Sequence, residues 1–300
     1  MQANTEGIDA ANLLENREIK HKTVGIVGLG LIGGSLGIDF RRRGLRVLGV
    51  SRSPLTCDLA LRRGAVDQAS DDLSLLQQAE VIFICTPIAA ITATVRELLT
   101  YITPETILTD VGSVKEQILW EVLPLWANFV GGHPMAGTAE SGIMAAQEGL
   151  FINAPYILTP VDSTPPESVA VVASLVRSLG VKLYFTSPQD HDRAVGLISH
   201  LPVMISASLI DTCSRAGNNN IVSLAQNLAS SGFRDTSRVG GGNPELGLMM
   251  AQYNRQALLD SLEQYQQNLQ QVITLIETEN WLDLQKMLET TQVTRPNFLR

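Results

Sequence analysis

The sequence has few cysteines, and they are dispersed. Only three of the 300 residues are cysteine, and no two have the Cys-x-x-Cys spacing. Their odd number and wide separation argue against a disulfide framework or a zinc site, so we expect no bound metal. Free thiols fit a reducing compartment, which favours a cytoplasmic location.

Basic residues and long apolar runs are also scarce. Lys and Arg total 22 against 30 Asp and Glu, which gives a net charge of -8 and disfavours nucleic acid or an anionic membrane as a partner. Residues 1–22 form a polar tail without a signal-peptide core. No run reaches the roughly 18 uncharged apolar residues that a membrane span needs. We therefore expect a cytoplasmic protein that binds neither nucleic acid nor membrane.

Short apolar runs alternate with segments of helical spacing from residue 23 to about 187. The runs lie at 24–27, 45–50, 81–85, 106–110 and 129–131. Such β-rich runs are typical of strands buried on both faces. Their alternation with helices predicts an α/β fold with a doubly wound, mostly parallel sheet of the Rossmann type. Two later runs, 156–158 and 181–185, are predicted to extend this sheet.

After Pro188 the strand-like runs end and helical spacing takes over. Residues 190–213 predict a long apolar helix, and apolar residues at near-heptad spacing predict another over 246–276, which 281–288 continue. We therefore predict two domains, an α/β domain over 23–187 and an all-α domain over 188–300. Long apolar helices with little sheet to cover favour a homodimer through the second domain; a monomeric bundle is the alternative.

A glycine-rich turn follows the first predicted strand directly and opens a helix. It reads Gly28-Leu29-Gly30-Leu31-Ile32-Gly33. The first glycine allows the tight turn, the second lets the backbone approach a pyrophosphate, and the third lets helix and strand pack closely. Free N–H groups at the start of the helix face the phosphates. The turn predicts a dinucleotide site in the first domain and an NAD(P)-dependent dehydrogenase.

The end of the second strand indicates which dinucleotide binds. NAD enzymes usually carry a carboxylate there, whereas this strand ends in Ser51-Arg52-Ser53. Arg52 would attract a 2′-phosphate and could stack on the adenine, and both serines can donate hydrogen bonds to that phosphate. We therefore predict NADP as the cofactor. The alternative is that Arg52 is a solvated surface charge.

Residues just after the strands are the candidates for chemistry, because these loops share the edge where ligands bind. Thr86 and Pro87 follow the run at 81–85 and are predicted to contact the cofactor. Ser113 follows the next run, and His133 follows the one after it. A dehydrogenase must take a proton from a hydroxyl while hydride leaves the carbon, and an imidazole with an ordinary pKa of about 6.5 suits this step. His133 is therefore the predicted base.

Other polar residues near these positions have weaker arguments. Ser113 has two possible roles: it positions the substrate oxygen or the nicotinamide, or it caps a loop. Lys115 is most simply a surface or helix-start charge. In the second domain, Arg238 can hold a carboxylate bidentately and is predicted to bind substrate. Arg234 is the alternative, although the adjacent Asp235 suggests a structural pair.

Five motifs in one order resemble those of the prephenate/arogenate dehydrogenase family of tyrosine biosynthesis. They lie at residues 27–35, 110–115, 132–137, 199–202 and 232–238. The resemblance covers nearly all of the chain after residue 22 and is strongest to the cyanobacterial NADP-dependent arogenate dehydrogenases. It implies oxidative decarboxylation of L-arogenate to L-tyrosine: hydride leaves C4 of the cyclohexadienol for NADP+, CO2 leaves C1, and the ring becomes aromatic.

The resemblance also implies roles for single residues. His133 bonds the C4 hydroxyl and takes its proton, Ser113 supports that contact near the nicotinamide, and Arg238 holds a substrate carboxylate. Thr138 and His200, in or next to matching motifs, are expected to contact substrate, although for His200 a packing role ranks first. The helical domain of the family forms the dimer.

Two positions differ from relatives that use prephenate. Val203 stands where many of them carry a second His, and Ala139 stands where some carry Glu. Both changes favour arogenate; the alternative is a prephenate dehydrogenase that yields 4-hydroxyphenylpyruvate.

Two further hypotheses compete with this one. A β-hydroxyacid dehydrogenase or an imine reductase would join the same kinds of domain. The β-hydroxyacid dehydrogenases, however, share the use of a Lys on the first long helix of the helical domain. No Lys occurs between Lys182 and Lys286, which argues against it. A non-catalytic NADP-binding sensor would not need a His at the carboxyl end of a strand.

Overall fold

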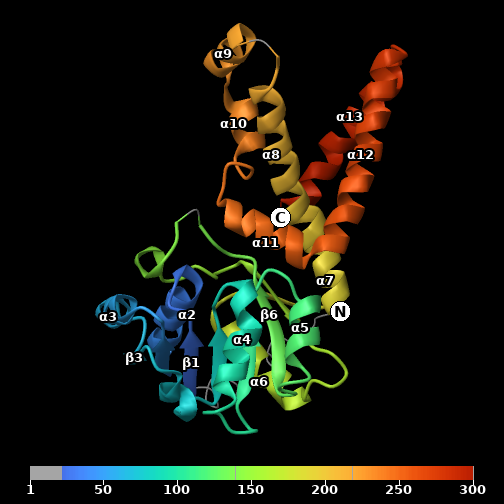
Figure 1. The fold of residues 1–300 in the computed structure, drawn as a ribbon. Helices are drawn as coiled ribbons and strands as arrows, with labels where there is room; N and C mark the ends of the chain where they lie inside the picture. Colours follow the sequence, from blue (N-terminus) through green and yellow to red (C-terminus); the bar gives the residue numbers. More distant parts are fainter. Residues whose placement is uncertain (1–21, 139, 218, 300) are drawn as a thin grey trace, which may run out of the picture. The chain divides into compact units, whose positions relative to one another are not determined.

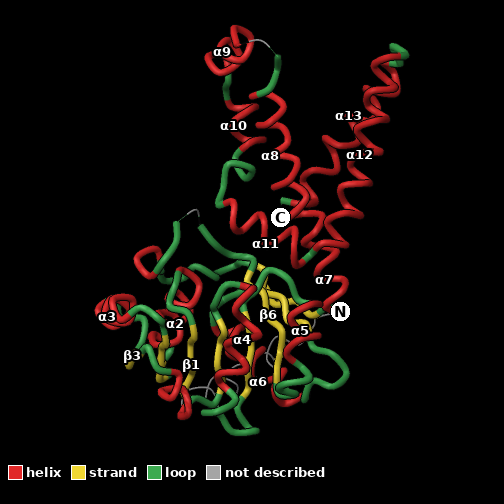
Figure 2. The backbone as a smooth tube through the Cα atoms, viewed as in Figure 1, coloured by secondary structure: helices red, strands yellow, loops and turns green. Residues whose placement is uncertain are grey.

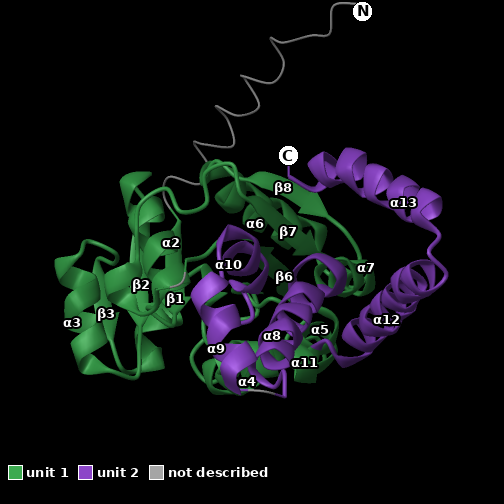
Figure 3. Ribbon diagram, turned by 90° about the horizontal axis from the view of Figure 1, so that it is seen from above, with its two compact units in different colours: residues 1–195, 241–253 green, residues 196–240, 254–300 purple. Residues whose placement is uncertain are grey.

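The computed structural model describes residues 22–138, 140–217 and 219–299. Apart from Lys22, the predicted polar tail lies outside these residues. Two compact units divide the chain: residues up to Val195 with Gly241–Tyr253, and Gly196–Gly240 with Asn254–Arg300 (Figure 3). The first unit thus extends past the predicted boundary at residue 187 and also takes in a later segment.

One sheet of eight strands forms the centre of the first unit (Figures 1 and 2). The strands are β1 (Thr23–Val27), β2 (Arg46–Val50), β3 (Gln68–Ser70), β4 (Val81–Ile84), β5 (Ile107–Asp110), β6 (Phe129–Pro134), β7 (Pro155–Thr159) and β8 (Lys182–Phe185). Their order is β3-β2-β1-β4-β5-β6-β7-β8. Strands β1 to β6 are parallel, β7 runs antiparallel to β6, and β8 is parallel to β7. The predicted mostly parallel, Rossmann-type sheet is confirmed.

Helices cover both faces of this sheet. The helices of the first unit are α2 (Leu31–Arg42), α3 (Pro54–Arg62), η1 (Leu73–Gln78), α4 (Ile88–Leu98), α5 (Glu116–Val122), η2 (Ile143–Ala145), α6 (Pro166–Ser178), α7 (Pro188–Val195) and α11 (Pro244–Tyr253). Strand side chains alternate between the two faces. In β4, Phe83 joins a cluster with Phe40 of α2 and Val176 of α6, whereas Ile82 joins a second cluster with Ile91 of α4. This two-sided burial explains why the strands are continuous apolar runs.

The strand order reverses beside β1, and this reversal positions the dinucleotide site. Strand β2 lies on one side of β1 and β4 on the other. The connections leave β1 and β4 in opposite directions along the sheet, so the loops at their carboxyl ends separate and leave a crevice. The glycine turn lies at that point.

The second unit is helical. Its helices are η3 (Gly196–His200), α8 (Leu201–Ser214), α9 (Asn219–Leu228), α10 (Ser231–Ser237), α12 (Arg255–Glu277), α13 (Trp281–Thr294) and η4 (Arg295–Phe298). Arg234 lies within α10. The helix predicted over 246–276 is broken at Asn254, whose φ of -117° and ψ of 38° are not helical. A left-handed Glu279, with φ of 53°, separates α12 from α13.

Among the described residues, one helical stretch, Pro188–Ser214, is long and apolar enough to cross a membrane by length and composition alone. This stretch is not an uncharged apolar run, because it includes Arg193 and Asp211. It contains a π-helical turn, η3, just before Pro202. Because proline has no N–H to donate to the preceding turn, an irregular turn at this point is expected.

Candidate functional site

Two glycines of the turn are required by the packing of the protein itself. Gly28 has a φ of +96°, and a Cβ there would lie 2.6 Å from the carbonyl oxygen of Cys85. A Cβ on Gly33 would lie 2.1 Å from the carbonyl oxygen of Gly28. The Gly28 N–H donates to the Val50 carbonyl at 2.8 Å, which fixes the turn against β2. Leu29 is buried in the core, so only its backbone is available to a ligand.

Gly30 has a different reason to be glycine. A Cβ there would have no atom of the described protein within 4 Å. Gly30 is also the N-cap of α2, and it supplies no side-chain hydrogen bond to the first turn. The N–H groups of Leu31 and Ile32 therefore begin a helix beside open space, which is the arrangement that binds a pyrophosphate. These residues fit a dinucleotide.

Polar side chains follow β2 at the place where an adenosine ribose would lie. The hydroxyl oxygen of Ser53 accepts the Thr56 N–H at 3.3 Å and caps α3, and that of Ser51 accepts the Ser53 N–H at 3.4 Å. Both hydroxyl hydrogens remain able to donate. Arg52 is exposed, and no hydrogen bond or ion pair ties it to the described residues. The three side chains fit a phosphate group.

Two buried hydroxyls lie at the same edge of the sheet. Thr86 follows β4 beside Gly28, and Pro87 begins α4. Ser113 follows β5. The side-chain oxygens of Thr86 and Ser113 are buried and have no hydrogen-bond partner among the described residues. Leaving such a group unsatisfied costs about 1–3 kcal/mol, so both are placed for a ligand group.

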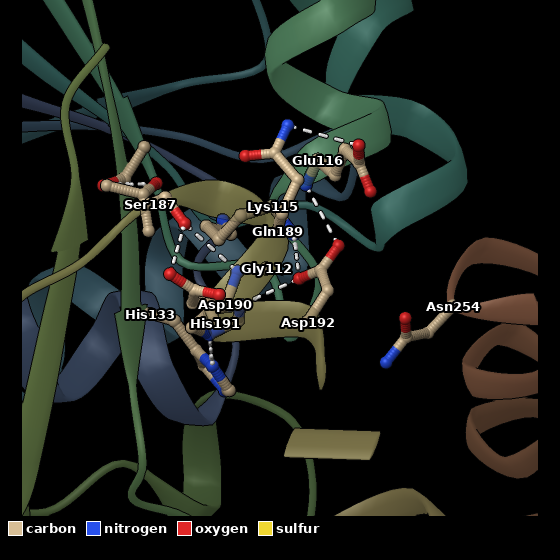
Figure 4. A network of polar contacts seen from close by, with 12 residues as sticks. Gly112, Lys115, Glu116, His133, Ser187, Gln189, Asp190, His191, Asp192 and Asn254 are labelled. Atoms are coloured by element: carbon tan, nitrogen blue, oxygen red, sulfur yellow. Dashed lines mark hydrogen bonds and ion pairs between the residues drawn. The ribbon is translucent and has the colours of Figure 1, made fainter. Parts of the chain in front are cut away.

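His133 lies within β6, as its second-last residue. The run predicted at 129–131 extends to Pro134, so the loop placement of His133 was wrong, although its end of the sheet was right. Its side chain is buried, and Nδ1 lies 2.8 Å from Nε2 of His191 (Figure 4). The two rings meet edge to face, with centroids 5.0 Å apart. His133 therefore presents Nδ1 to the protein.

His191 and Asp192 are components of this site that the sequence did not reveal. Nδ1 of His191 lies 2.7 Å from a carboxylate oxygen of Asp192. The same carboxylate accepts the backbone N–H groups of Lys115 at 2.8 Å and Glu116 at 2.9 Å (Figure 4). A His-Asp doublet in the first turns of α7 was the one available signal.

The register of the last strands explains why α7 reaches His133. Phe185 at the end of β8 pairs with Leu158 of β7, which pairs with Gly132 of β6. The chain therefore leaves β8 at the level of the residue before His133. This depends on the reversed direction of β7 and β8, which the sequence does not specify.

Lys115 is fully buried, so its prediction as a surface charge was wrong, whereas the alternative of a helix-start residue is confirmed, because Lys115 is the N-cap of α5. Its ammonium group pairs with the Asp110 carboxylate and donates to the Gly132 carbonyl at 2.7 Å. Asp110 also accepts the N–H groups of Gly112 and Gly132, at 2.8 and 3.1 Å. Burial lowers the pKa of Lys115, and the charge of Asp110 opposes that shift. The pair joins the ends of β5 and β6, beside Ser113 and His133.

The remaining predicted residues have varied surroundings. Thr138 is exposed, and its hydroxyl accepts the Glu140 N–H at 3.2 Å. In the second unit, Arg238 is exposed just after α10, and the predicted Arg234–Asp235 pair is confirmed at 3.0 Å.

His200, also in the second unit, is fully buried. Its Nδ1 lies 3.0 Å from the Asn254 amide nitrogen. Substrate roles for Thr138, Arg238 and His200 stay predictions. Among the described residues, no group of three or more His, Cys, Asp or Glu side chains could hold a metal.

Comparison with known proteins gives matches along most of the chain. The family model for the prephenate dehydrogenase nucleotide-binding domain matches residues 36–185, and that for the prephenate dehydrogenase dimerization domain matches residues 187–290. Prephenate dehydrogenase of Bacillus subtilis strain 168 is 32% identical over 277 residues, which are 90% of this chain and 74% of that protein.

Two solved structures are similar over nearly their whole length. Arogenate dehydrogenase of Synechocystis is 55% identical with a TM-score of 0.85, covering 92% of this chain and 99% of that one. Prephenate dehydrogenase from A. aeolicus, in complex with hydroxyphenyl propionate and NAD+, is 25% identical with a TM-score of 0.87, covering 92% of this chain and 98% of that one.

Proposed function

This chain belongs to the prephenate dehydrogenase family, and we propose that it oxidatively decarboxylates L-arogenate to L-tyrosine with NADP+ as the hydride acceptor. The observation that carries the chemistry is the position of His133. It lies at the carboxyl end of β6, on the sheet edge that also holds the glycine turn, Thr86 and Ser113. A buried imidazole there can take a proton next to a bound nicotinamide.

NADP+, when bound, would accept hydride from C4 of the substrate. As hydride leaves, His133 takes the proton of the C4 hydroxyl, and the Ser113 hydroxyl bonds the same oxygen. The electrons of the breaking C1–carboxylate bond then aromatise the ring, and CO2 leaves. The resulting phenolate recovers the proton from His133, so the reaction as a whole neither releases nor consumes one. Because aromatisation supplies driving force, the chain mainly has to orient the groups.

Three residues are proposed to hold the rest of the substrate. Arg238 pairs with a carboxylate bidentately, a geometry that guanidinium favours. Thr138 and His200 contribute further polar contacts. Val203 supports arogenate, because relatives that use prephenate often carry His there, and the 55% identity to an arogenate dehydrogenase supports the same substrate. Ala139, the other differing position, lies outside the described residues.

The cofactor preference is proposed from the end of β2. An exposed guanidinium with two hydroxyls beside it complements a 2′-phosphate, and a carboxylate that would repel that phosphate is missing from Ser51-Arg52-Ser53. Thr86 and Pro87 are proposed to contact the cofactor at the end of β4. The relative from A. aeolicus was solved with NAD+, so NAD+ is the alternative to test.

A cytoplasmic homodimer through the helices of the second unit completes the proposal. The matching family model describes this region as a dimerization domain. Along α12, Leu269, Ile273 and Ile276 are 47%, 39% and 49% exposed in the single chain. They recur at four- and three-residue spacing, so they form one apolar stripe that a second copy can cover.

One spectrophotometric experiment tests substrate and cofactor together. Arogenate and prephenate are each offered with NAD+ and NADP+, and reduction is followed. We expect the highest kcat/KM with arogenate and NADP+. Equal turnover of prephenate would refute the substrate, a clear NAD+ preference would refute the cofactor, and no turnover in all four mixtures would favour the non-catalytic sensor.

His133→Ala tests the catalytic role directly. We expect a loss of about 100-fold or more in kcat, in the range for removal of a general base. A variant with nearly normal turnover would refute the assignment.

A further inference from the structure

The hydrogen bonds that link His133, His191 and Asp192 indicate which ring nitrogen of His133 carries the hydrogen. We propose that His191, held by Asp192, is a positioning residue that keeps His133 in the Nδ1–H tautomer, so that Nε2 bears the lone pair that receives the substrate proton. This inference rests on the proposed role of His133 as the base, and it adds two residues to that site.

The direction begins at Asp192. Its carboxylate accepts the Lys115 N–H at 2.8 Å and the Glu116 N–H at 2.9 Å, and one of its oxygens lies 2.7 Å from Nδ1 of His191. The two backbone groups can only donate, so they favour an ionised carboxylate, which can only accept. A carboxylate in turn requires a hydrogen on Nδ1 of His191.

The same logic continues through His191. A neutral imidazole with its hydrogen on Nδ1 has a bare Nε2, which accepts a hydrogen bond. The atom that faces it, at 2.8 Å, is Nδ1 of His133. This nitrogen must therefore carry the hydrogen, and Nε2 of His133 is the basic nitrogen. The opposite direction would require a doubly protonated His191.

Burial makes this order of hydrogen bonds consequential. His133, His191 and Asp192 are 8%, 2% and 4% exposed. Water therefore does not readily replace a missing partner, and a wrong tautomer of His133 would point two hydrogens or two lone pairs at each other. When His133 takes a proton, its new positive charge also faces a neutral acceptor backed by the Asp192 carboxylate, which stabilises the charged ring.

Kinetics of four variants test the positioning role. His191→Ala removes the acceptor, and we expect kcat to fall about 100-fold, because the base loses its tautomer and its support. His191→Gln retains a carbonyl acceptor near the position of Nε2 without the link to Asp192, so a loss of about 10-fold is expected. The KM values for substrate and cofactor should change little, since orientation acts on the chemical step.

Asp192→Asn and Asp190→Asn form a matched pair. Both remove one carboxylate from α7, but Asp190 is exposed, and its carboxylate accepts only the Ser187 hydroxyl among the described residues, at 2.9 Å, while its own N–H donates to the oxygen of that hydroxyl at 3.1 Å. We expect a fall of at least about 10-fold in kcat for Asp192→Asn and no change for Asp190→Asn. Equal kcat in wild type, His191→Ala and Asp192→Asn would overturn the inference.

A ground-state measurement separates this inference from the proposed function. Nitrogen NMR of the intact protein, labelled at histidine and assigned with His133→Ala, reports which ring nitrogen carries hydrogen. We expect Nδ1–H on His133 in the wild type and in His191→Gln, and a shift toward Nε2–H in His191→Ala. Nε2–H in the wild type would overturn the inference, whatever the turnover. If His133→Ala stays active while the tautomer is as expected, the proposed base fails and the hydrogen-bond order stands.

Discussion

The buried pair of Lys115 and Asp110 allows a quantitative test of the site's framework. Both side chains are 0% exposed, and Lys115→Met replaces the ammonium group with an apolar group of similar volume. Removing one partner of a buried pair typically costs 3–5 kcal/mol, because an uncompensated charge stays behind. Asp110 keeps the Gly112 and Gly132 N–H groups, so we expect a loss of about 3 kcal/mol, at the lower end of that range.

Urea unfolding at fixed protein concentration measures this loss. Trp126 packs against one of the two apolar clusters of the sheet, and its fluorescence reports the first unit. Lys22→Met is the matched control: its pair with Glu80 is 25% and 50% exposed, so a change below about 1 kcal/mol is expected. If Lys115→Met is as stable as Lys22→Met, the reasoning about burial is refuted. Adding Asp110→Asn to Lys115→Met should recover part of the loss, because it removes the unpaired charge.

Three further predictions concern binding and assembly. Gly30→Val should raise the KM for the cofactor about 10-fold without lowering Tm, whereas Gly28→Ala should lower Tm, because only the Cβ at Gly28 meets protein atoms. Thermal melts and initial rates check both variants, and an equal fall in Tm would contradict the argument. Arg52→Glu should lower kcat/KM for NADP+ about 10- to 100-fold and leave that for NAD+ nearly unchanged, and equal losses would argue against a 2′-phosphate contact. Leu269→Glu with Ile273→Glu should give a monomer by light scattering; an unchanged dimer would place the interface elsewhere.

The sequence predicts well those elements whose composition matches their burial in the fold. The apolar runs of β1 and β4 are buried on both faces, so their composition identifies them without knowledge of their neighbours. The glycine turn is recognisable from its local spacing and its place between β1 and α2, although the contact that excludes a Cβ at Gly28 comes from the distant Cys85 carbonyl. From these, the parallel sheet and the edge that holds Ser113 and His133 could be predicted.

The features that sequence did not predict depend on distant partners. The sequence predicts Lys115 as a surface or helix-start charge because charged side chains are seldom buried, and only the fold brings Asp110 and the Gly132 carbonyl around its ammonium group. The contact between His191 and His133 is not predictable in the same way, because it depends on the reversed strands β7 and β8, which leave no periodic signal. The break of a long helix at Asn254 interrupts an apolar pattern that continues on both sides.

The hydrogen bonds that Asp192 forms with Lys115, Glu116 and His191 have a consequence for protein engineering. The carboxylate holds the N–H groups of Lys115 and Glu116, next to the loop of Ser113, and it also holds His191 against His133. Residues 110–134 and 186–195 therefore have to match one another, although more than fifty residues separate the two segments in the chain. Chimeras between relatives should stay active when both segments come from the same parent and should lose activity when the crossover divides them.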